Sequence, residues 1–200
     1  MLTLYHAPQS RSSRILWLLE ELNANYEIAY VDIPRADESG AADPKNPHPD
    51  KKVPALVHDG ELITESIAIV LYLTDMLPEA GIGPKVGDPG RGAYLTWLAY
   101  YAGVMEPVLN HQFLNLGDHE GLARTFRSRK EMDQHILDAL NRSSYITGED
   151  FTAVDIIIAS LGHIIREMLP AGDVVDAYLE SCGKRPALAA ANAKDSPPSP

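Results

Sequence analysis

The sequence has little cysteine, little basic charge and no long apolar run. Cys182 is the only cysteine among 200 residues, which excludes an internal disulfide and a zinc site built from several cysteines. Seventeen lysine and arginine residues against 28 acidic residues give a net charge of −11, which disfavours binding to nucleic-acid phosphates. No run reaches the roughly 18 apolar residues of a membrane-spanning helix. We therefore expect neither nucleic acid nor a membrane as a partner.

The N-terminal residues and the single thiol predict a cytoplasmic location. The segment MLTLYHAPQSRSSR turns polar after five residues and lacks the apolar core of a secretory signal. A protein with one cysteine fits a reducing compartment. The seven histidines do not show a metal-ligand spacing such as HExxH, so we expect no metal site.

An α/β domain is predicted over residues 1–78. Apolar alternation and helical spacing predict strands at 2–5, 26–31, 55–58 and 61–64 and helices at 12–22 and 67–77. Asp59-Gly60 favours a type I′ turn that joins the last two strands. The order β-α-β, long loop, β-β-α predicts a four-stranded mixed sheet with one crossover.

An all-helical domain is predicted over residues 91–200, after a glycine- and proline-rich linker at 79–90. Helical patterns cover 91–115, 120–141, 153–169 and about 174–182. Pro107 should kink the first of these helices. Thr152 and Asp155 form a capping box, and we expect the tail from residue 189 to fray.

The Val53-Pro54 pair opens the third predicted strand. If this peptide bond is cis, the N–H and C=O of Val53 are free to pair with an extended ligand. The alternative is a trans proline that starts an edge strand.

Glu65 and Ser66 stand where the fourth strand gives way to a helix. The first N–H groups of a helix bind carboxylates, and a glutamate beside them can accept from an ammonium group. The pair could therefore hold an amino-acid zwitterion. Ordinary N-capping by Ser66 or Thr64 is the alternative.

The turn between the first strand and the first helix is rich in hydroxyl groups. Ser10 and Ser12 flank Arg11 there, and Ser13 and Arg14 follow. Such a turn can donate hydrogen bonds to an anion, including a thiolate. The alternative is a capped, solvated turn.

Together these segments resemble the cytosolic glutathione transferase family over Leu2 to about Ala187. The resemblance lies in the order and spacing of VPAL at 53–56, ES at 65–66, the serine-bearing first turn and the FTAVD segment at 151–155. It implies a thioredoxin-like glutathione-binding domain followed by an all-helical domain for electrophile binding and dimerisation. It further implies a homodimer that uses glutathione as co-substrate, with no other cofactor.

The resemblance also implies roles for the residues that would hold glutathione. Pro54 would be a cis-proline, and Val53 would bond the cysteinyl part through its backbone. Glu65 and Ser66 would bind the γ-glutamyl part. The approach to VPAL, residues 46–52, is bulkier than is usual in the family, which leaves the partner of the glycyl carboxylate open.

The thiolate of glutathione would be stabilised by a first-turn hydroxyl. The family pattern implies Ser10, with Ser12 and then Tyr5 as alternatives. Arg11 sits near the position where some bacterial members carry a reactive cysteine, so a mixed-disulfide mechanism is not expected. Arg11, with Lys51 and Lys52, would supply positive charge for a tripeptide of net negative charge.

A hydrophobic electrophile would lie against aromatic residues of the helical domain. Tyr94, Trp97 and Tyr101 fall on one face of the helix predicted at 91–115. Another stripe of the same helix consists of Leu95, Leu98, Ala102, Met105 and Leu109. The alternative is that one stripe belongs to the core and the other to a subunit interface.

The function predicted first is that of a glutathione transferase acting on a small hydrophobic electrophile or a peroxide. A glutathione-dependent isomerase of the maleylacetoacetate type ranks lower, because that signature has a cysteine where Arg11 stands. A non-catalytic glutathione-transferase-like binding or scaffold protein is the third candidate. The sequence has no C-x-x-C motif, which argues against a thioredoxin-type disulfide oxidoreductase.

Overall fold

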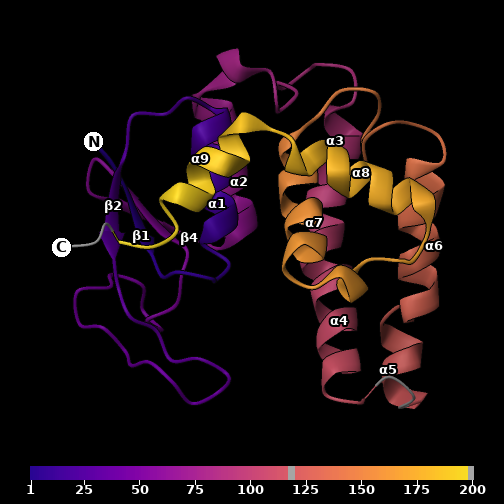
Figure 1. Cartoon of the computed structure of the whole chain (residues 1–200), viewed down its shortest axis with the longest axis horizontal. Coiled ribbons are helices and arrows are strands. Elements are labelled where there is room, and N and C mark those ends of the chain that lie inside the picture. The colour runs from indigo at the N-terminus through magenta and orange to yellow at the C-terminus, as the bar shows by residue number, and fades with distance from the viewer. Residues whose placement is uncertain (117–119, 198–200) are drawn as a thin grey trace. The chain divides into compact units, whose positions relative to one another are not determined.

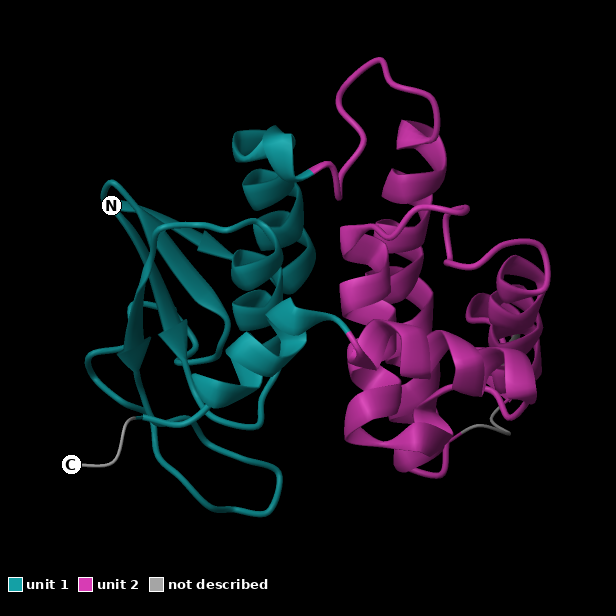
Figure 2. Ribbon diagram, turned by 45° about the horizontal axis from the view of Figure 1, so that its top comes forward, with its two compact units in different colours: residues 1–80, 185–200 teal, residues 81–184 magenta. Residues whose placement is uncertain are grey.

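A computed structural model of the protein describes residues 1–116 and 120–197. The chain forms two compact units, residues 1–80 with 185–200 and residues 81–184 (Figure 2). The first break falls at the predicted linker. Residues 185–200, which we expected in the helical domain, group instead with the unit that carries the sheet.

The first unit contains a four-stranded mixed sheet, which confirms the predicted fold class. Its strands are β1 (Leu2–His6), β2 (Glu27–Tyr30), β3 (Ala55–His58) and β4 (Glu61–Thr64). Their order is β2-β1-β3-β4, and only β1 and β2 run parallel. Asp59 and Gly60 have positive φ angles of 49° and 91°, the sign that a type I′ turn needs at both positions.

Helices of the first unit gather on one side of the sheet (Figure 1). They are α1 (Ser13–Glu21), α2 (Ser66–Met76) and α9 (Pro186–Ala193), with a short 3-10 helix at Pro78–Ala80. α1 and α2 bury apolar side chains such as Leu16 and Ile69, and the sheet buries Leu4 and Leu56. The core of this unit therefore lies between the helices and the sheet.

The helix α9 differs from the fraying tail that we expected. Arg185 donates to both carboxylate oxygens of Glu21, at 2.6 and 2.7 Å, and α9 packs against α1. Pro186 suits the first helical position, and the alanine-rich run that follows favours a helix. The tail is thus held by contacts with residues far earlier in the chain.

The second unit is built from helices. They are α3 (Arg91–Tyr100), α4 (Glu106–Phe113), α5 (Glu120–Thr125), α6 (Arg129–Leu140), α7 (Ala153–Ile164) and α8 (Asp173–Gly183), with a π-helix at Tyr101–Met105 and a 3-10 helix at Arg166–Met168. The π-helix directly precedes α4, where Pro107 lacks an N–H for the preceding turn. The single helix predicted over 91–115 is therefore divided by this π-helix just before Pro107.

The helix predicted over 120–141 is broken into α5 and α6. Ser128 has extended backbone angles and caps α6 by accepting from the N–H of Glu131, whose carboxylate accepts from the N–H of Ser128. This capping box begins a new helix where periodicity alone predicts a continuous one. In the described part of the chain, none of the helices is long and apolar enough to cross a membrane.

Candidate active site

Three segments singled out in the sequence meet at one end of the sheet. Cross-strand pairs run from Tyr5 on β1 to Ala55 on β3, and from Ala55 to Thr64 on β4. Because these residues form one row, the turn after β1, the Val53–Pro54 peptide before β3 and Glu65–Ser66 after β4 are neighbours. The sheet topology brings these predicted binding segments together.

Ser10 lies in the turn before α1 and is half-buried. Its Oγ lies 2.7 Å from the carbonyl oxygen of Ala7 and 2.7 Å from the Oγ of Ser12, and its single hydrogen can be donated to either. The N–H of Ser12 donates to the Oγ of Ser10 at 3.2 Å. The hydroxyl group of Ser10 is thus partly exposed, and the N–H of Ser12 holds its oxygen in place.

Ser12 is fully buried and is bonded to a buried histidine. Its Oγ lies 2.7 Å from Nδ1 of His6 and accepts from the N–H of Ala7 at 3.2 Å. His6 itself has no exposed surface. Burial lowers the pKa of His6 below its usual value, while the carbonyl and carboxylate of Asp195 act in the opposite direction. Our sequence analysis did not single out His6, although it falls in the inward phase of β1 with Leu2 and Leu4.

Asp195, in the segment after α9, contacts the first turn. Its carboxylate accepts from the N–H of Gln9 at 3.0 Å and from the hydroxyl of Ser13, and its backbone carbonyl lies 2.9 Å from Nε2 of His6. The tail segment therefore forms part of the candidate site. No local sequence pattern indicated this, because the contact joins residues 189 positions apart.

Tyr5 and Arg11 occupy different positions from the serine pair. Side chains alternate along a strand, so Tyr5 lies on the opposite face of β1 from His6. The structure thus separates Tyr5 from the hydrogen-bonded group formed by His6, Ser12 and Ser10. Arg11 is exposed on the turn.

The peptide bond between Val53 and Pro54 is cis. Pro54 is buried at the entrance to β3, and Val53 is half-buried. This isomer is the one that the family resemblance implied for Pro54. The trans alternative considered from the sequence is wrong.

The loop before Val53 is organised around the buried side chain of Asn46. That side chain donates to the carbonyl of Lys52 at 3.0 Å and accepts from the N–H of His48 at 3.0 Å. Lys51 donates its ammonium to the carbonyl of Asn46 at 2.6 Å. Lys52 is exposed, so its side chain is the accessible cation next to the cis peptide.

Glu65 occupies the N-cap position of α2 with backbone angles φ 67° and ψ 121°. This left-handed conformation is uncommon for a residue other than glycine, and such strain concentrates at ligand sites. No side chain in the described residues caps α2. The first N–H groups of α2 beside Ser66 are therefore available to a ligand carboxylate, rather than used in the ordinary capping that we considered as the alternative.

The three aromatic residues predicted to contact an electrophile are buried in the helical unit. Tyr94, Trp97 and Tyr101 expose 0%, 7% and 3% of their surface. The Trp97 ring stacks on His135 with ring centroids 4.3 Å apart, and the Tyr101 hydroxyl donates to Glu106. This burial favours a role in the core for that stripe. In the second stripe Leu98 and Met105 are buried as well, whereas Leu95 and Ala102 are exposed.

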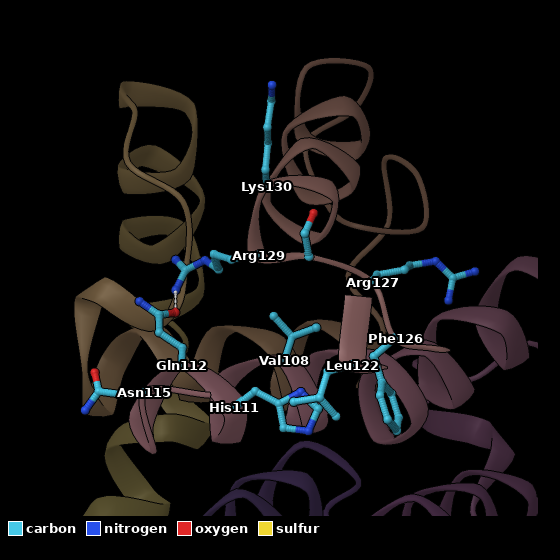
Figure 3. A pocket seen from close by; sticks show the side chains of 10 residues that line it. Val108, His111, Gln112, Asn115, Leu122, Phe126, Arg127, Arg129 and Lys130 are labelled. Atoms are coloured by element: carbon cyan, nitrogen blue, oxygen red, sulfur yellow. Dashed lines mark hydrogen bonds between the residues drawn. The ribbon is translucent and has the colours of Figure 1, made fainter. Parts of the chain in front are cut away.

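A cavity of about 480 Å³ lies in the helical unit, between α4, α5 and the start of α6 (Figure 3). Its lining consists of Val108, His111, Gln112, Asn115, Leu122, Phe126, Arg127, Ser128, Arg129 and Lys130. Arg129 is bonded to Asp133 and Gln112, and Figure 3 shows Arg127 and Lys130 extending away from the other side chains. The cavity contains none of the residues predicted to bind glutathione or the electrophile.

Comparisons with known proteins agree with this geometry. Residues 1–75 match the model of the glutathione S-transferase N-terminal domain. A probable maleylacetoacetate isomerase of Caenorhabditis elegans is 31% identical over 159 residues, which cover 76% of this chain and 72% of that protein.

Solved structures are similar over nearly the whole chain. A glutathione S-transferase from Actinobacillus pleuropneumoniae has a TM-score of 0.80 at 27% identity, covering 98% of this chain and 93% of that one. A sphingomonad glutathione S-transferase complexed with glutathione has a TM-score of 0.77 at 26% identity, covering 96% and 98%. With its domain match, its relatives and its fold, the chain belongs to the glutathione S-transferase family.

Proposed function

We propose that the protein binds glutathione at the end of the sheet and activates its sulfur as a thiolate for attack on a small hydrophobic electrophile or a peroxide. The observation that supports this most directly is the row Tyr5–Ala55–Thr64, which makes the first turn, the cis peptide and the start of α2 neighbours. A similar sphingomonad glutathione S-transferase is complexed with glutathione in its solved structure.

The tripeptide would lie extended across the entrance to β3. Val53 would bond the cysteinyl part through its backbone N–H and C=O. Glu65 would accept from the γ-glutamyl ammonium, and the N–H groups at Ser66 would receive the adjacent carboxylate. The exposed cations Lys52 and Arg11 supply local positive charge against the net charge of −11.

Hydrogen-bond capacity favours Ser10 over Ser12 as the group that donates to the sulfur. Ser12 is buried and contacts His6, Ala7 and Ser10, so its hydroxyl has no path to a ligand. Ser10 is half-buried, and its hydroxyl can turn from its acceptors within the turn toward a thiolate. A free thiol has a pKa of about 8.5, and lowering it by two units takes about 2.7 kcal/mol, within reach of one charged hydrogen bond and a helix dipole.

The Ser10→Ala variant tests this assignment. We expect the rate of thiol addition to fall about 10- to 100-fold, because a hydrogen bond to a charged group is lost. The pKa of the bound thiol should rise, while affinity for glutathione stays nearly constant. Ser39→Ala, in an exposed loop, is the matched control. Unchanged turnover in Ser10→Ala would overturn the assignment of Ser10 as the donor to the sulfur.

A glutathione-dependent isomerase is the second candidate, because a probable maleylacetoacetate isomerase is among the relatives. Arg11 remains the departure from that signature. Turnover of a cis-dienoic diacid in the presence of glutathione would favour the isomerase. Retention on immobilised glutathione with no turnover of any electrophile would favour the third candidate, a non-catalytic binding protein.

The protein should act as a homodimer in the cytoplasm, as family membership and the single thiol lead us to propose. Leu95 is 39% exposed on α3, Ala99 is exposed one turn further along the same helix, and Ala102 is exposed in the π-helix that follows. Such a face of small and apolar side chains suits contact with a second copy. Because Tyr94, Trp97 and Tyr101 are buried, we do not assign them to the binding site for the electrophile.

A further inference from the structure

Four groups of the first unit form an unbroken hydrogen-bonded chain. The Oγ atoms of Ser10 and Ser12 are 2.7 Å apart, and the Oγ of Ser12 is 2.7 Å from Nδ1 of His6. Nε2 of His6 is 2.9 Å from the backbone carbonyl of Asp195. The chain runs from the part-exposed hydroxyl of Ser10 to a fully buried imidazole.

The contact with Asp195 fixes which ring nitrogen of His6 carries the hydrogen. A backbone carbonyl can only accept, so Nε2 must donate to it. In the neutral ring Nδ1 is then an acceptor, and the hydroxyl of Ser12 donates to it. The Oγ of Ser12 can in turn accept from the hydroxyl of Ser10. Because Ser12 gives its hydrogen to Nδ1, the hydrogen between the two serine oxygens has to come from Ser10, whose hydroxyl then points to Ser12 and not to the Ala7 carbonyl. In this arrangement of the free protein the donors point inward, from Ser10 toward His6.

We propose that His6 takes up, through Ser12 and Ser10, the proton that glutathione loses when its sulfur becomes a thiolate. This inference rests on the proposed function. The thiol S–H bond breaks and its proton joins the Oγ of Ser10. The hydroxyl proton of Ser10 moves to the Oγ of Ser12, and that of Ser12 moves to Nδ1 of His6. No proton is gained or lost overall, and the products are a thiolate and an imidazolium.

Counting hydrogen bonds in the thiolate state leads to the same result. If Ser10 donates to the sulfur, its oxygen no longer donates to Ser12. The two oxygens at 2.7 Å then need the hydroxyl of Ser12 between them. Ser12 can supply it only when Nδ1 of His6 has become a donor. Since Nε2 is already protonated, a fully satisfied thiolate state requires the imidazolium.

The surroundings of His6 contain a group that can stabilise its positive charge. The Oδ1 of Asp195 lies 3.6 Å from Nε2, and the same carboxylate is anchored by Gln9 and Ser13. From β2 the Tyr30 ring faces His6 with centroids 5.7 Å apart, and α1 also carries the buried Arg14 beyond Ser12. Burial lowers the pKa of His6, which favours the neutral ring that a proton acceptor needs. Asp195 then offsets part of the cost of charging it.

Nitrogen NMR of the His6 ring in the full chain tests the proposal directly. The free protein should show the neutral ring with hydrogen on Nε2, and saturation with glutathione should convert it to the doubly protonated ring. S-methylglutathione, which has no thiol proton, should leave the ring neutral. A ring that stays neutral while ultraviolet absorbance reports bound thiolate would overturn the relay and leave the proposed function intact. Absence of any thiolate would overturn both.

Proton counting with a pH indicator supplies a second readout. Glutathione binding to the wild-type protein should release close to no proton at a pH just above neutrality. His6→Asn keeps a hydrogen-bonding side chain without basicity, so it should release the thiol proton to the buffer and form thiolate about tenfold or more slowly. His58→Asn is the matched control, since His58 also bonds a hydroxyl through Nδ1 but lies at the far end of β3. The relay would be contradicted if the wild type, His6→Asn and His58→Asn each released one full proton per glutathione bound.

Discussion

At the scale of single residues, Asp155 is a fully buried carboxylate at the start of α7. It accepts from the N–H groups of Ile146 and Thr152, at 3.0 and 2.8 Å, and from the hydroxyl of Tyr178 at 3.2 Å. Burial raises the pKa of Asp155 to about 6, and the hydrogen bonds only partly oppose this. The capping box predicted from Thr152 and Asp155 is present and is the centre of a buried polar network.

The raised pKa of Asp155 makes the stability of the protein depend on pH. The folded chain binds this proton more tightly than the unfolded chain, so the contribution is complete below about pH 4 and is lost as the pH rises through about 6. Two pKa units correspond to about 3 kcal/mol at most. Asparagine does not titrate, so Asp155→Asn should not lose this stability as the pH rises. The free energy of unfolding of Asp155→Asn minus that of the wild type should therefore increase from pH 4 to pH 7.

Urea denaturation of both proteins across that range measures the difference. Ser160→Ala on the same helix, which removes a buried hydroxyl bonded to the Ile157 carbonyl, is the control with no titrating group. Its difference from wild type should be constant with pH. A constant difference for Asp155→Asn as well would show that Asp155 titrates equally in the folded and unfolded chains.

A site residue can be predicted from the sequence when its own neighbours in the chain define its structural position. Pro54, Glu65 and Ser66 could be singled out because their own neighbours in the chain define a strand entrance and a helix start. His6 could not, because a histidine at the inward phase of a strand is indistinguishable from a core residue until Ser12 and Asp195 are placed beside it. Asp195 could not be predicted either, because nothing in its own segment indicates that its carboxylate contacts the first turn.

At the scale of elements, two ion pairs join the ends of α9 to α1, Arg185 with Glu21 and Lys194 with Glu20, and the first of them is the less exposed. The Glu21 side chain is 7% exposed and Arg185 is 29% exposed, and both guanidinium contacts are short. Arg185→Ala would leave a nearly buried carboxylate without this partner, which should lower the free energy of unfolding by about 1–3 kcal/mol. Lys184→Ala, which breaks only an exposed pair with Glu180, should change it little.

Chemical denaturation of the two variants checks this comparison. Equal effects of Arg185→Ala and Lys184→Ala would mean that the bidentate pair does not stabilise α9. Because α9 leads to Asp195, Arg185→Ala should also alter the first turn, which the ring signals of His6 would report.

The same contrast explains which elements the sequence predicted. The β3–β4 hairpin follows from Asp59 and Gly60 alone, since these residues tolerate the positive φ angles that the turn requires. α9 is a short alanine-rich segment, and such helices are marginal without tertiary packing. Its stability comes from α1 and Glu21, 164 positions earlier, which no window along the chain contains.

At the scale of the whole molecule, the proposed dimer depends on whether α3 has an accessible apolar face. Leu95 is the large apolar residue of that face, beside the exposed Ala99 and Ala102, whereas Tyr94 and Trp97 of the same helix are buried. Leu95→Glu would place a negative charge in the contact from each of the two copies. Each copy already has a net charge of −11, so the two charges would add to the repulsion between the copies.

We expect sedimentation velocity to give twice the chain mass of 21.9 kDa for the wild-type protein and the single mass for Leu95→Glu. Val86→Glu, which changes an 86% exposed residue outside α3 by the same charge, should remain dimeric. Glutathione binding should survive in the monomeric variant, because the row Tyr5–Ala55–Thr64 belongs to one chain. A dimeric Leu95→Glu would place the contact elsewhere, and a monomeric wild-type protein would refute the dimer altogether.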